Sequence, residues 1–131
     1  MFLHIDPSDG LAIYAQVVRQ VKFAVANGTL NPGELAPSVR ELARELTINP
    51  NTVTRAYRQL QTDGVLQTVR GTGLEVAVGA PKHCRSERVK LIRDRLRQAL
   101  VEAKHSQLSA QDVRGLVEEE LTALDREETQ P

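Results

Sequence analysis

The sequence of 131 residues has little of what marks several large classes of protein. It contains no tryptophan, and phenylalanine and tyrosine make up only 3% of it, so leucine, valine, isoleucine and alanine must fill the core. No apolar run approaches the roughly 18 residues that a membrane-spanning helix needs. The first ten residues lack the basic start and the long apolar stretch of a signal peptide. We therefore expect a folded domain that does not contact membranes and is located in the cytoplasm.

Cysteine is nearly absent, and the common catalytic motifs are missing. The single cysteine, Cys84, excludes a disulfide within the chain and fits a reducing compartment. Its neighbour His83 points away from it on any regular helix or strand, and His4 and His105 lie far away in the sequence, so we expect no metal site. There is no glycine-rich phosphate loop and no nucleophile elbow. We expect neither an enzyme nor a cofactor, and we leave open a redox-sensitive role for Cys84 at a subunit interface.

The basic and acidic residues balance over the whole sequence but are unevenly distributed along it. The formal charge of zero argues against a general nucleic-acid coat protein. Residues 82–105 carry eight basic and three acidic side chains, whereas residues 106–131 carry two and seven. Solvated helix faces of opposite sign that pair with each other are one interpretation of this pattern. A non-specific phosphate contact from Lys82, Arg85 and Arg88 is the alternative.

One clear boundary lies at Gly79-Ala80-Pro81, after which the pattern becomes helical and rich in charge. We place an N-terminal domain at residues 1–79, and a linker with two helices at residues 80–131.

The N-terminal domain is expected to contain three helices. Apolar residues recur at helical spacing from Tyr14 to Val25, and Asn27-Gly28 supplies a stop. Ser38 and Glu41 form a capping box for a second helix. Only three residues then precede a third helix, which begins at Pro50 behind the cap residue Asn49. Two short helices that are joined so tightly and have facing apolar stripes indicate a helix-turn-helix.

The apolar period changes after Gly64. Residues 66–70 and 74–78 predict two strands around the tight turn Gly71-Thr72-Gly73. A hairpin directly after a helix-turn-helix is a wing. The expected fold is therefore mainly α with a small β-hairpin, namely a winged helix-turn-helix followed by a two-helix segment.

The second helix of a helix-turn-helix enters the major groove of DNA. With Val53, Ala56 and Leu60 facing inward, the outward side chains are amides, hydroxyls and arginines, which suit contacts with bases or phosphates. Including the helix starts and the tip of the wing, the candidates for DNA contact are Ser38, Arg40, Asn49, Asn51, Thr52, Thr54, Arg55, Tyr57, Arg58, Arg70, Gly71 and Thr72.

Several candidates also have a purely structural interpretation. Capping is the simpler role for Ser38 and Asn49. An ordinary solvated face is the alternative for Arg55 and Arg58, and a plain hairpin turn is the alternative for the wing tip, with DNA contact favoured at both. We expect Tyr57 to be partly buried with its hydroxyl near a phosphate. The sequence leaves open which arginines contact bases and which contact phosphates.

A set of spaced motifs carries a family resemblance. The motifs are Tyr14-Ala15-Gln16, residues 28–33, residues 37–43, Asn49-Pro50-Asn51-Thr52-Val53, Arg55-Ala56-Tyr57 and Asp63-Gly64. Together they resemble GntR-family regulators over about residues 11–78, and the Asn-Pro-Asn-Thr-Val run is most similar to the YtrA subfamily. The resemblance implies a winged-helix repressor that binds a palindromic operator as a dimer. Position by position, it implies DNA contacts from Arg40, Asn51, Thr52, Arg55 and Gly71.

We therefore expect a sequence-specific transcriptional regulator bound to double-stranded DNA. The alternative is a winged-helix module that binds protein, which would show an apolar outward face on the third helix. Asn51, Thr54, Arg55 and Arg58 favour DNA. Glu75 departs from the family pattern and would repel phosphate if it faced DNA. Operator, regulated genes and any small-molecule effector are unknown from the sequence.

Two amphipathic helices are expected after Pro81. Ser86 is the expected cap of the first, and Ser109 with Asp112 starts the second. Such helices bury little as an isolated pair and need another surface, either the winged domain or a second subunit. A second copy also fits a two-fold operator, whose half-sites lie roughly 34 Å apart. We expect a homodimer whose contacts are Val89, Ile92, Leu96, Leu100, Val113, Leu116, Val117 and Leu121.

Overall fold

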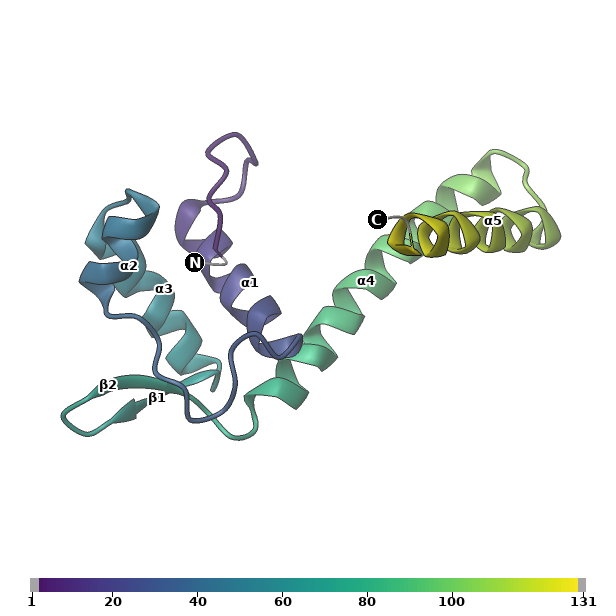
Figure 1. Ribbon diagram of the computed structural model, residues 1–131. Helices are drawn as coiled ribbons and strands as arrows, with labels where there is room; N and C mark the ends of the chain where they lie inside the picture. Colours follow the sequence, from purple (N-terminus) through teal and green to yellow (C-terminus); the bar gives the residue numbers. More distant parts are fainter. Residues whose placement is uncertain (1–2, 130–131) are drawn as a thin grey trace. The chain divides into compact units, whose positions relative to one another are not determined.

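A computed structural model describes residues 3–129 (Figure 1). Its elements are α1 (Ile13–Ala26), α2 (Val39–Leu46), α3 (Pro50–Thr62), β1 (Leu66–Val69), β2 (Gly73–Val76), α4 (Ala80–His105) and α5 (Ala110–Thr129). This order confirms a mainly helical fold in which three helices and a hairpin precede two long helices. Contacts divide the chain into two units, the first ending at Val89 and the second beginning at Lys90. The sequence predicts domains at residues 1–79 and 80–131. These ranges include residues 1–2 and 130–131, which lie outside the described residues.

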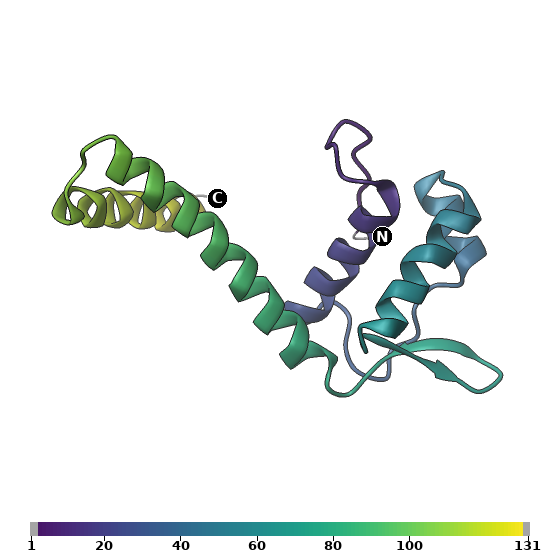
Figure 2. The same ribbon diagram turned by 180° about the vertical axis from the view of Figure 1, so that it is seen from behind.

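The first three helices form the helix-turn-helix and its support. Helices α1 and α3 lie side by side in both ribbon views (Figures 1 and 2). Val17 of α1, Leu42 of α2 and Val53 of α3 are fully buried. Thr47 ends α2 with a φ of 55°, which few residues other than glycine adopt. The left-handed Thr47 reverses the chain, so only three residues separate α2 from α3, as predicted.

The wing is an antiparallel hairpin in which Leu66 lies opposite Val76. The loop before α2 runs along the other edge of β2, where the N–H of Gly33 donates to the carbonyl of Val76 (2.9 Å) and the N–H of Ala36 to that of Leu74 (2.8 Å). The periodicity gave no sign of this pairing. It satisfies backbone groups that an open strand edge leaves free, and it fixes the hairpin against the domain.

Helix α4 begins at Ala80, so the prediction that Ser86 caps it was wrong. Pro81 suits the first turn of a helix, because its missing N–H needs no partner there. Ala80 and Cys84 are buried in the core of the first unit, with exposed fractions of 1% and 2%. The start of α4 is therefore part of the winged-helix unit and not a linker.

Ion pairs also hold α4 in place. Lys22 of α1 contacts Asp63 at the end of α3 (2.8 Å) and Glu87 of α4 (3.0 Å). Burial opposes the charge on Lys22, but the hydrogen bonds to the two carboxylates outweigh it and raise the pKa of Lys22. Burial raises the pKa of the nearby Cys84 to about 11, and Glu87 adds to the shift. The Cys84 thiol is thus buried and protonated at neutral pH, which does not fit a redox-sensitive thiol at an interface.

The second unit contains the rest of α4 and the whole of α5. The predicted start of α5 is confirmed by a reciprocal cap, in which the N–H of Asp112 donates to Ser109 Oγ (3.1 Å) and the N–H of Ser109 to Asp112 Oδ2 (3.0 Å). None of the residues described in this unit is buried. Across the described chain, no helix combines the length and the apolar character needed to cross a membrane.

Candidate nucleic-acid interface

Helix α3 has one buried face and one exposed polar face. Val53 and Leu60 are fully buried against the rest of the first unit. Asn51, Arg55 and Arg58 are exposed, and their spacing of four and three residues places them together on the opposite face. Asparagine can pair with adenine, and arginine with guanine, through two hydrogen bonds each. This face can therefore contact base edges or phosphates, and it is polar as DNA binding requires.

The starts of α2 and α3 are capped by side chains. Ser38 Oγ accepts from the N–H of Glu41 (3.1 Å), and Asn49 Oδ1 accepts from the N–H of Asn51 (2.8 Å). In both caps the side chain acts as an acceptor, and Ser38 and Asn49 are exposed residues. The remaining free N–H groups and the dipole of a helix start favour a phosphate nearby.

Two threonines on α3 are less accessible than the arginines. Thr52 and Thr54 are half-buried, and the hydroxyl of Thr54 donates to the carbonyl of Pro50 (3.1 Å). Thr54 can then offer a partner only its oxygen, as an acceptor. The Thr54 side chain is consequently suited to a base amino group and not to a phosphate.

Arg40 and the tip of the wing are exposed. Arg40 lies in the first turn of α2, and Arg70, Gly71 and Thr72 form the turn between β1 and β2. Gly71 has a φ of 78°, which a side chain disfavours. A glycine turn beside an arginine lets the backbone come close to a phosphate or to the minor groove.

Glu75 is held along the hairpin. It is half-buried, and its Oε1 accepts from Nε2 of Gln67 on the facing strand (2.7 Å). The carboxylate therefore lies across the sheet and is already bonded. This position lessens the phosphate repulsion that the sequence raised for the wing.

Tyr57 does not offer the phosphate contact expected of it. Its side chain is 5% exposed, and its hydroxyl donates to the carbonyl of Pro37 (2.8 Å). Burial raises the pKa of Tyr57 above its usual range, and the charges of Glu41 and Glu45 add to the shift. The only proton of the hydroxyl is thus used inside the protein. Tyr57 fixes the loop before α2 and leaves no donor for DNA.

Tyr14, which the sequence analysis placed in the apolar stripe of α1, lies beside Arg55 on the exposed face of α3. The guanidinium carbon of Arg55 lies 3.7 Å from the centre of the Tyr14 ring. In the same motif, the buried amide of Gln16 accepts from the N–H of Asp6 (2.8 Å) and donates to the carbonyl of Leu11 (2.9 Å). In the sequence, these two roles are indicated only by residue type. Tyr14 and Gln16 are a ring and an amide at the start of a helix whose apolar stripe is otherwise aliphatic.

Metal binding has no support among residues 3–129, where no three His, Cys, Asp or Glu side chains group in a way that could hold an ion.

Known proteins share both the sequence and the fold described above. The family model "Bacterial regulatory proteins, gntR family" matches residues 13–76. The "HTH-type transcriptional repressor YtrA" of Bacillus subtilis (strain 168) is 35% identical over 104 residues, which is 79% of this chain and 80% of that protein. The crystal structure of a transcriptional regulator from Oenococcus oeni matches with a TM-score of 0.78 and 27% identity, over 89% of this chain and 97% of that one. AraR(DBD), crystallised in complex with the operator ORE1, matches with a TM-score of 0.50 and 27% identity, over 56% of this chain and 89% of that one.

Proposed function

Because the chain belongs to the GntR family of bacterial DNA-binding transcriptional regulators, we propose that it is a repressor that binds a palindromic operator as a homodimer. The family consists of regulators, so the chain is not an enzyme. The exposed polar face of α3 is the observation that carries the proposal for DNA. The YtrA relative is named a transcriptional repressor, which supports the sign of regulation. A repressor acts at the chromosome, and we therefore propose a cytoplasmic location.

Within the interface, we assign the exposed face of α3 to the major groove. Asn51, Arg55 and Arg58 are the residues for base or backbone contact, with Thr52 and Thr54 beside them. AraR(DBD), a structural relative over this part of the chain, is bound to an operator, and this supports the same use of the fold here.

The other assigned contacts flank α3. Arg40 and the wing tip are placed at the DNA backbone and the adjacent minor groove. The capped helix starts at Ser38 and Asn49 are placed next to phosphates. A protein-binding module would instead show an apolar outward face on α3, and the face is polar.

An exposed apolar stripe on α4 and α5 supports the homodimer. Seven of its eight residues have exposed fractions between 42% and 56%, and Val113 is half-buried. Water disfavours such a stripe, and covering it is favourable by about 25 cal/mol for each Å² of apolar surface. Stable interfaces take roughly 20–30 residues from each side, which the helices of the second unit can supply. In the second unit the stripe consists of Ile92, Leu96, Leu100, Val113, Leu116, Val117 and Leu121, and Val89 is the eighth residue, at the end of the first unit.

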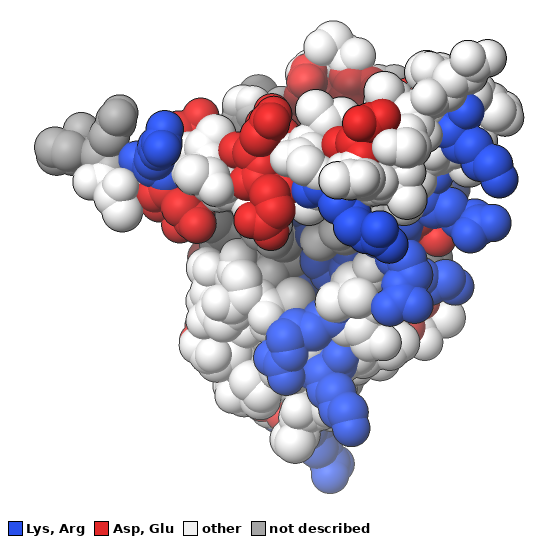
Figure 3. Space-filling view, turned by 90° about the vertical axis from the view of Figure 1, so that its right-hand side faces the viewer, with Lys and Arg blue, Asp and Glu red and all other residues white. Residues whose placement is uncertain are grey.

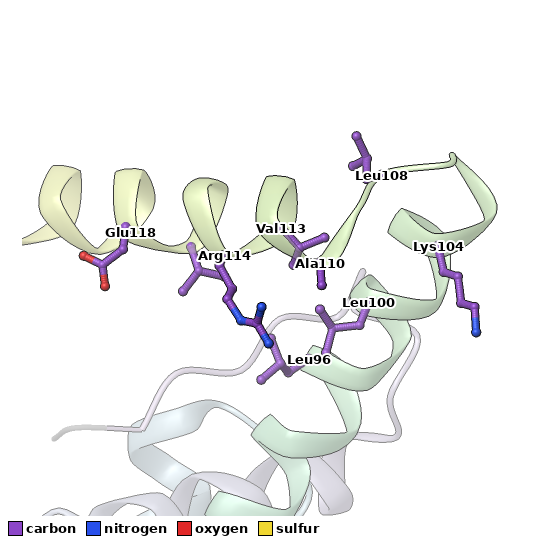
Figure 4. A pocket seen from close by; sticks show the side chains of 9 residues that line it. Leu96, Leu100, Lys104, Leu108, Ala110, Val113, Arg114 and Glu118 are labelled. Carbon is purple, nitrogen blue, oxygen red and sulfur yellow. The ribbon is translucent and has the colours of Figure 1, made fainter.

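The same unit has an apolar groove of about 830 Å³ between its helices (Figure 4). Leu96 and Leu100 of α4 and Ala110 and Val113 of α5 border it. We assign a helix of a second copy to this groove, because the stripe that needs cover continues into it. The result would be a small bundle of helices from two chains.

Charge supports pairing between copies. Residues 90–105 of α4 are predominantly basic, whereas α5 has acidic residues at 118–120, 125, 127 and 128. In the space-filling view, acidic and basic side chains gather in separate areas of one face (Figure 3). Helices of opposite sign attract when two copies meet, and like-charged arrangements are disfavoured.

A mobility-shift assay on the DNA upstream of the protein's own coding sequence tests the regulator. Arg55→Ala should weaken specific binding by roughly 5- to 150-fold for each half-site, the equivalent of about 1–3 kcal/mol for each lost base contact. Arg19→Ala, which removes an exposed arginine from α1, is the matched control and should bind like the wild type. Equal affinity for this DNA and for scrambled DNA across a salt series would contradict the proposal.

A further inference from the structure

The aromatic ring of Tyr14 lies against the guanidinium group of Arg55. The distance of 3.7 Å from Cζ to the ring centre is well inside the limit of about 6 Å for attraction between a cation and a ring face. Tyr14 is half-buried near the start of α1, whereas Arg55 is exposed on α3. A side chain that one helix holds in place therefore fixes a charged side chain of its neighbour.

Stacking of this kind leaves the arginine able to bind DNA. A guanidinium group is planar, and its N–H donors point outward in that plane, whereas the ring covers only one face. Two of these donors match the O6 and N7 atoms of guanine. An exposed arginine without such a support loses rotamer freedom when it binds, which weakens binding. Contact with the ring restricts the rotamers of Arg55 before DNA binds, so Arg55 loses less side-chain entropy on binding.

We propose that Tyr14 positions Arg55 to contact a base, so that a residue of α1, outside the helix-turn-helix, contributes to operator specificity. This inference rests on the proposed function, because Arg55 must first contact the operator. Tyr14 is a positioning residue: it acts through Arg55 and does not itself touch DNA.

The test selects binding sites for the full-length protein from a library of random-sequence duplexes. Binding to the selected duplex, to its single-base-pair variants and to a scrambled duplex is then measured by fluorescence anisotropy at one salt concentration. The base pair at which Arg55→Ala loses its preference identifies the contact of Arg55. Tyr14→Leu keeps apolar volume but removes the ring. We expect it to weaken binding about threefold per half-site, or about tenfold on a symmetrical site, with preference lost at the same base pair.

Two further variants separate positioning from folding. Tyr14→Phe keeps the ring and should retain the affinity and the base preference. Phe23→Leu removes the other ring–arginine pair of α1, in which Arg88 Cζ lies 4.6 Å from the ring centre, and should leave the base preference unchanged. Adding Tyr14→Leu to Arg55→Ala should cause no further loss, because the two residues act as one unit.

The outcomes that overturn the inference are distinct. Equal losses from Tyr14→Leu with and without Arg55, or a loss spread over all base pairs, would indicate a general structural role. Tighter binding by Tyr14→Leu would mean that the ring holds Arg55 away from DNA. If the wild-type chain selects no sequence, the proposed function fails as well. If it selects one that Tyr14→Leu binds equally well, only the role of Tyr14 fails.

Discussion

The two units of this chain differ in how far they cover their own apolar surface. In the first unit Leu42, Leu60 and Val76 are fully buried, and every buried side-chain nitrogen or oxygen among the described residues has a hydrogen-bond partner. In the second unit no described residue is buried, and Leu96 and Leu121 are about half exposed. A segment of about 40 residues is too small to build a sufficient core by itself. One chain therefore contains a domain that buries its own core, followed by a segment that leaves its apolar side chains exposed.

This difference separates two kinds of mutational effect. A change in the core of the first unit acts within one chain, so its effect on stability is independent of protein concentration. A change in the apolar stripe of the second unit acts through association, so its effect should depend on concentration. Operator binding combines both, since the DNA-contacting face belongs to the first unit and the pairing that we propose belongs to the second.

The largest effect is expected from a charge placed in the apolar stripe. Leu96→Glu would put an unpaired carboxylate into the proposed interface, which costs several kcal/mol in an apolar environment. We expect monomers, and a loss of operator affinity of about 10²- to 10⁴-fold because the two half-sites are no longer bound together. Sedimentation velocity and fluorescence anisotropy measure the two quantities.

Gln98→Glu is the matched control for that experiment. Gln98 is exposed on α4, on the side opposite Leu96, and the substitution adds the same charge. It should leave both the assembly and the affinity intact. If Leu96→Glu sediments like the wild type at every concentration, the second unit is not the interface. The exposed apolar side chains of this unit then play no part in pairing.

A smaller effect, in free energy, is expected from shortening leucines in the two units. Leu60→Ala removes a fully buried side chain of α3 and should lower the free energy of unfolding of the first unit by about 2–5 kcal/mol. Leu121→Ala shortens a side chain of α5 that is 52% exposed. Urea unfolding at two protein concentrations distinguishes them, because only the Leu121→Ala effect should change with concentration. A concentration-independent loss for Leu121→Ala would show that the second unit is stable by itself.

Local features of the fold could be predicted from the sequence because short-range rules determine them. The caps of α2, α3 and α5 involve residues two or three positions apart, such as Ser38 with Glu41 and Ser109 with Asp112. The three-residue turn and the hairpin follow from equally short segments. The exposed face of α3 also follows from spacing alone, and the DNA contacts assigned to it stay predictions.

Contacts between distant residues could not be predicted in this way. The hydroxyl of Tyr57 reaches Pro37, 20 residues away, and this partner decides that it has no donor for phosphate. Ala80 and Cys84 pack into the first unit, so α4 starts earlier than a search for a capping serine indicates. The pairing of Tyr14 with Arg55 also depends on how α1 meets α3. Helical periodicity shows that a face is apolar or polar but not which side chain lies opposite.

The smallest effect tests the ion pair within the first unit that joins Lys22 of α1 to Asp63 at the end of α3. Burial raises the pKa of Asp63, but the hydrogen bonds from Lys22 and Gln59 outweigh it, so the folded-state pKa is lowered. The ion pair therefore adds stability above the unfolded pKa of about 3.9, and this contribution is lost as the pH falls through the lower folded-state value.

Asp63→Asn keeps the acceptor for Gln59 but removes the charge. We expect it to be less stable than the wild type by less than about 1 kcal/mol at pH 6, and the difference to shrink as the pH falls below the unfolded pKa. Asp9→Asn changes the net charge equally at an exposed site, and its urea unfolding curves should follow those of the wild type. A stability difference for Asp63→Asn that is the same at pH 6 and pH 3 would show that the charge of Asp63 plays no part in joining α1 to α3.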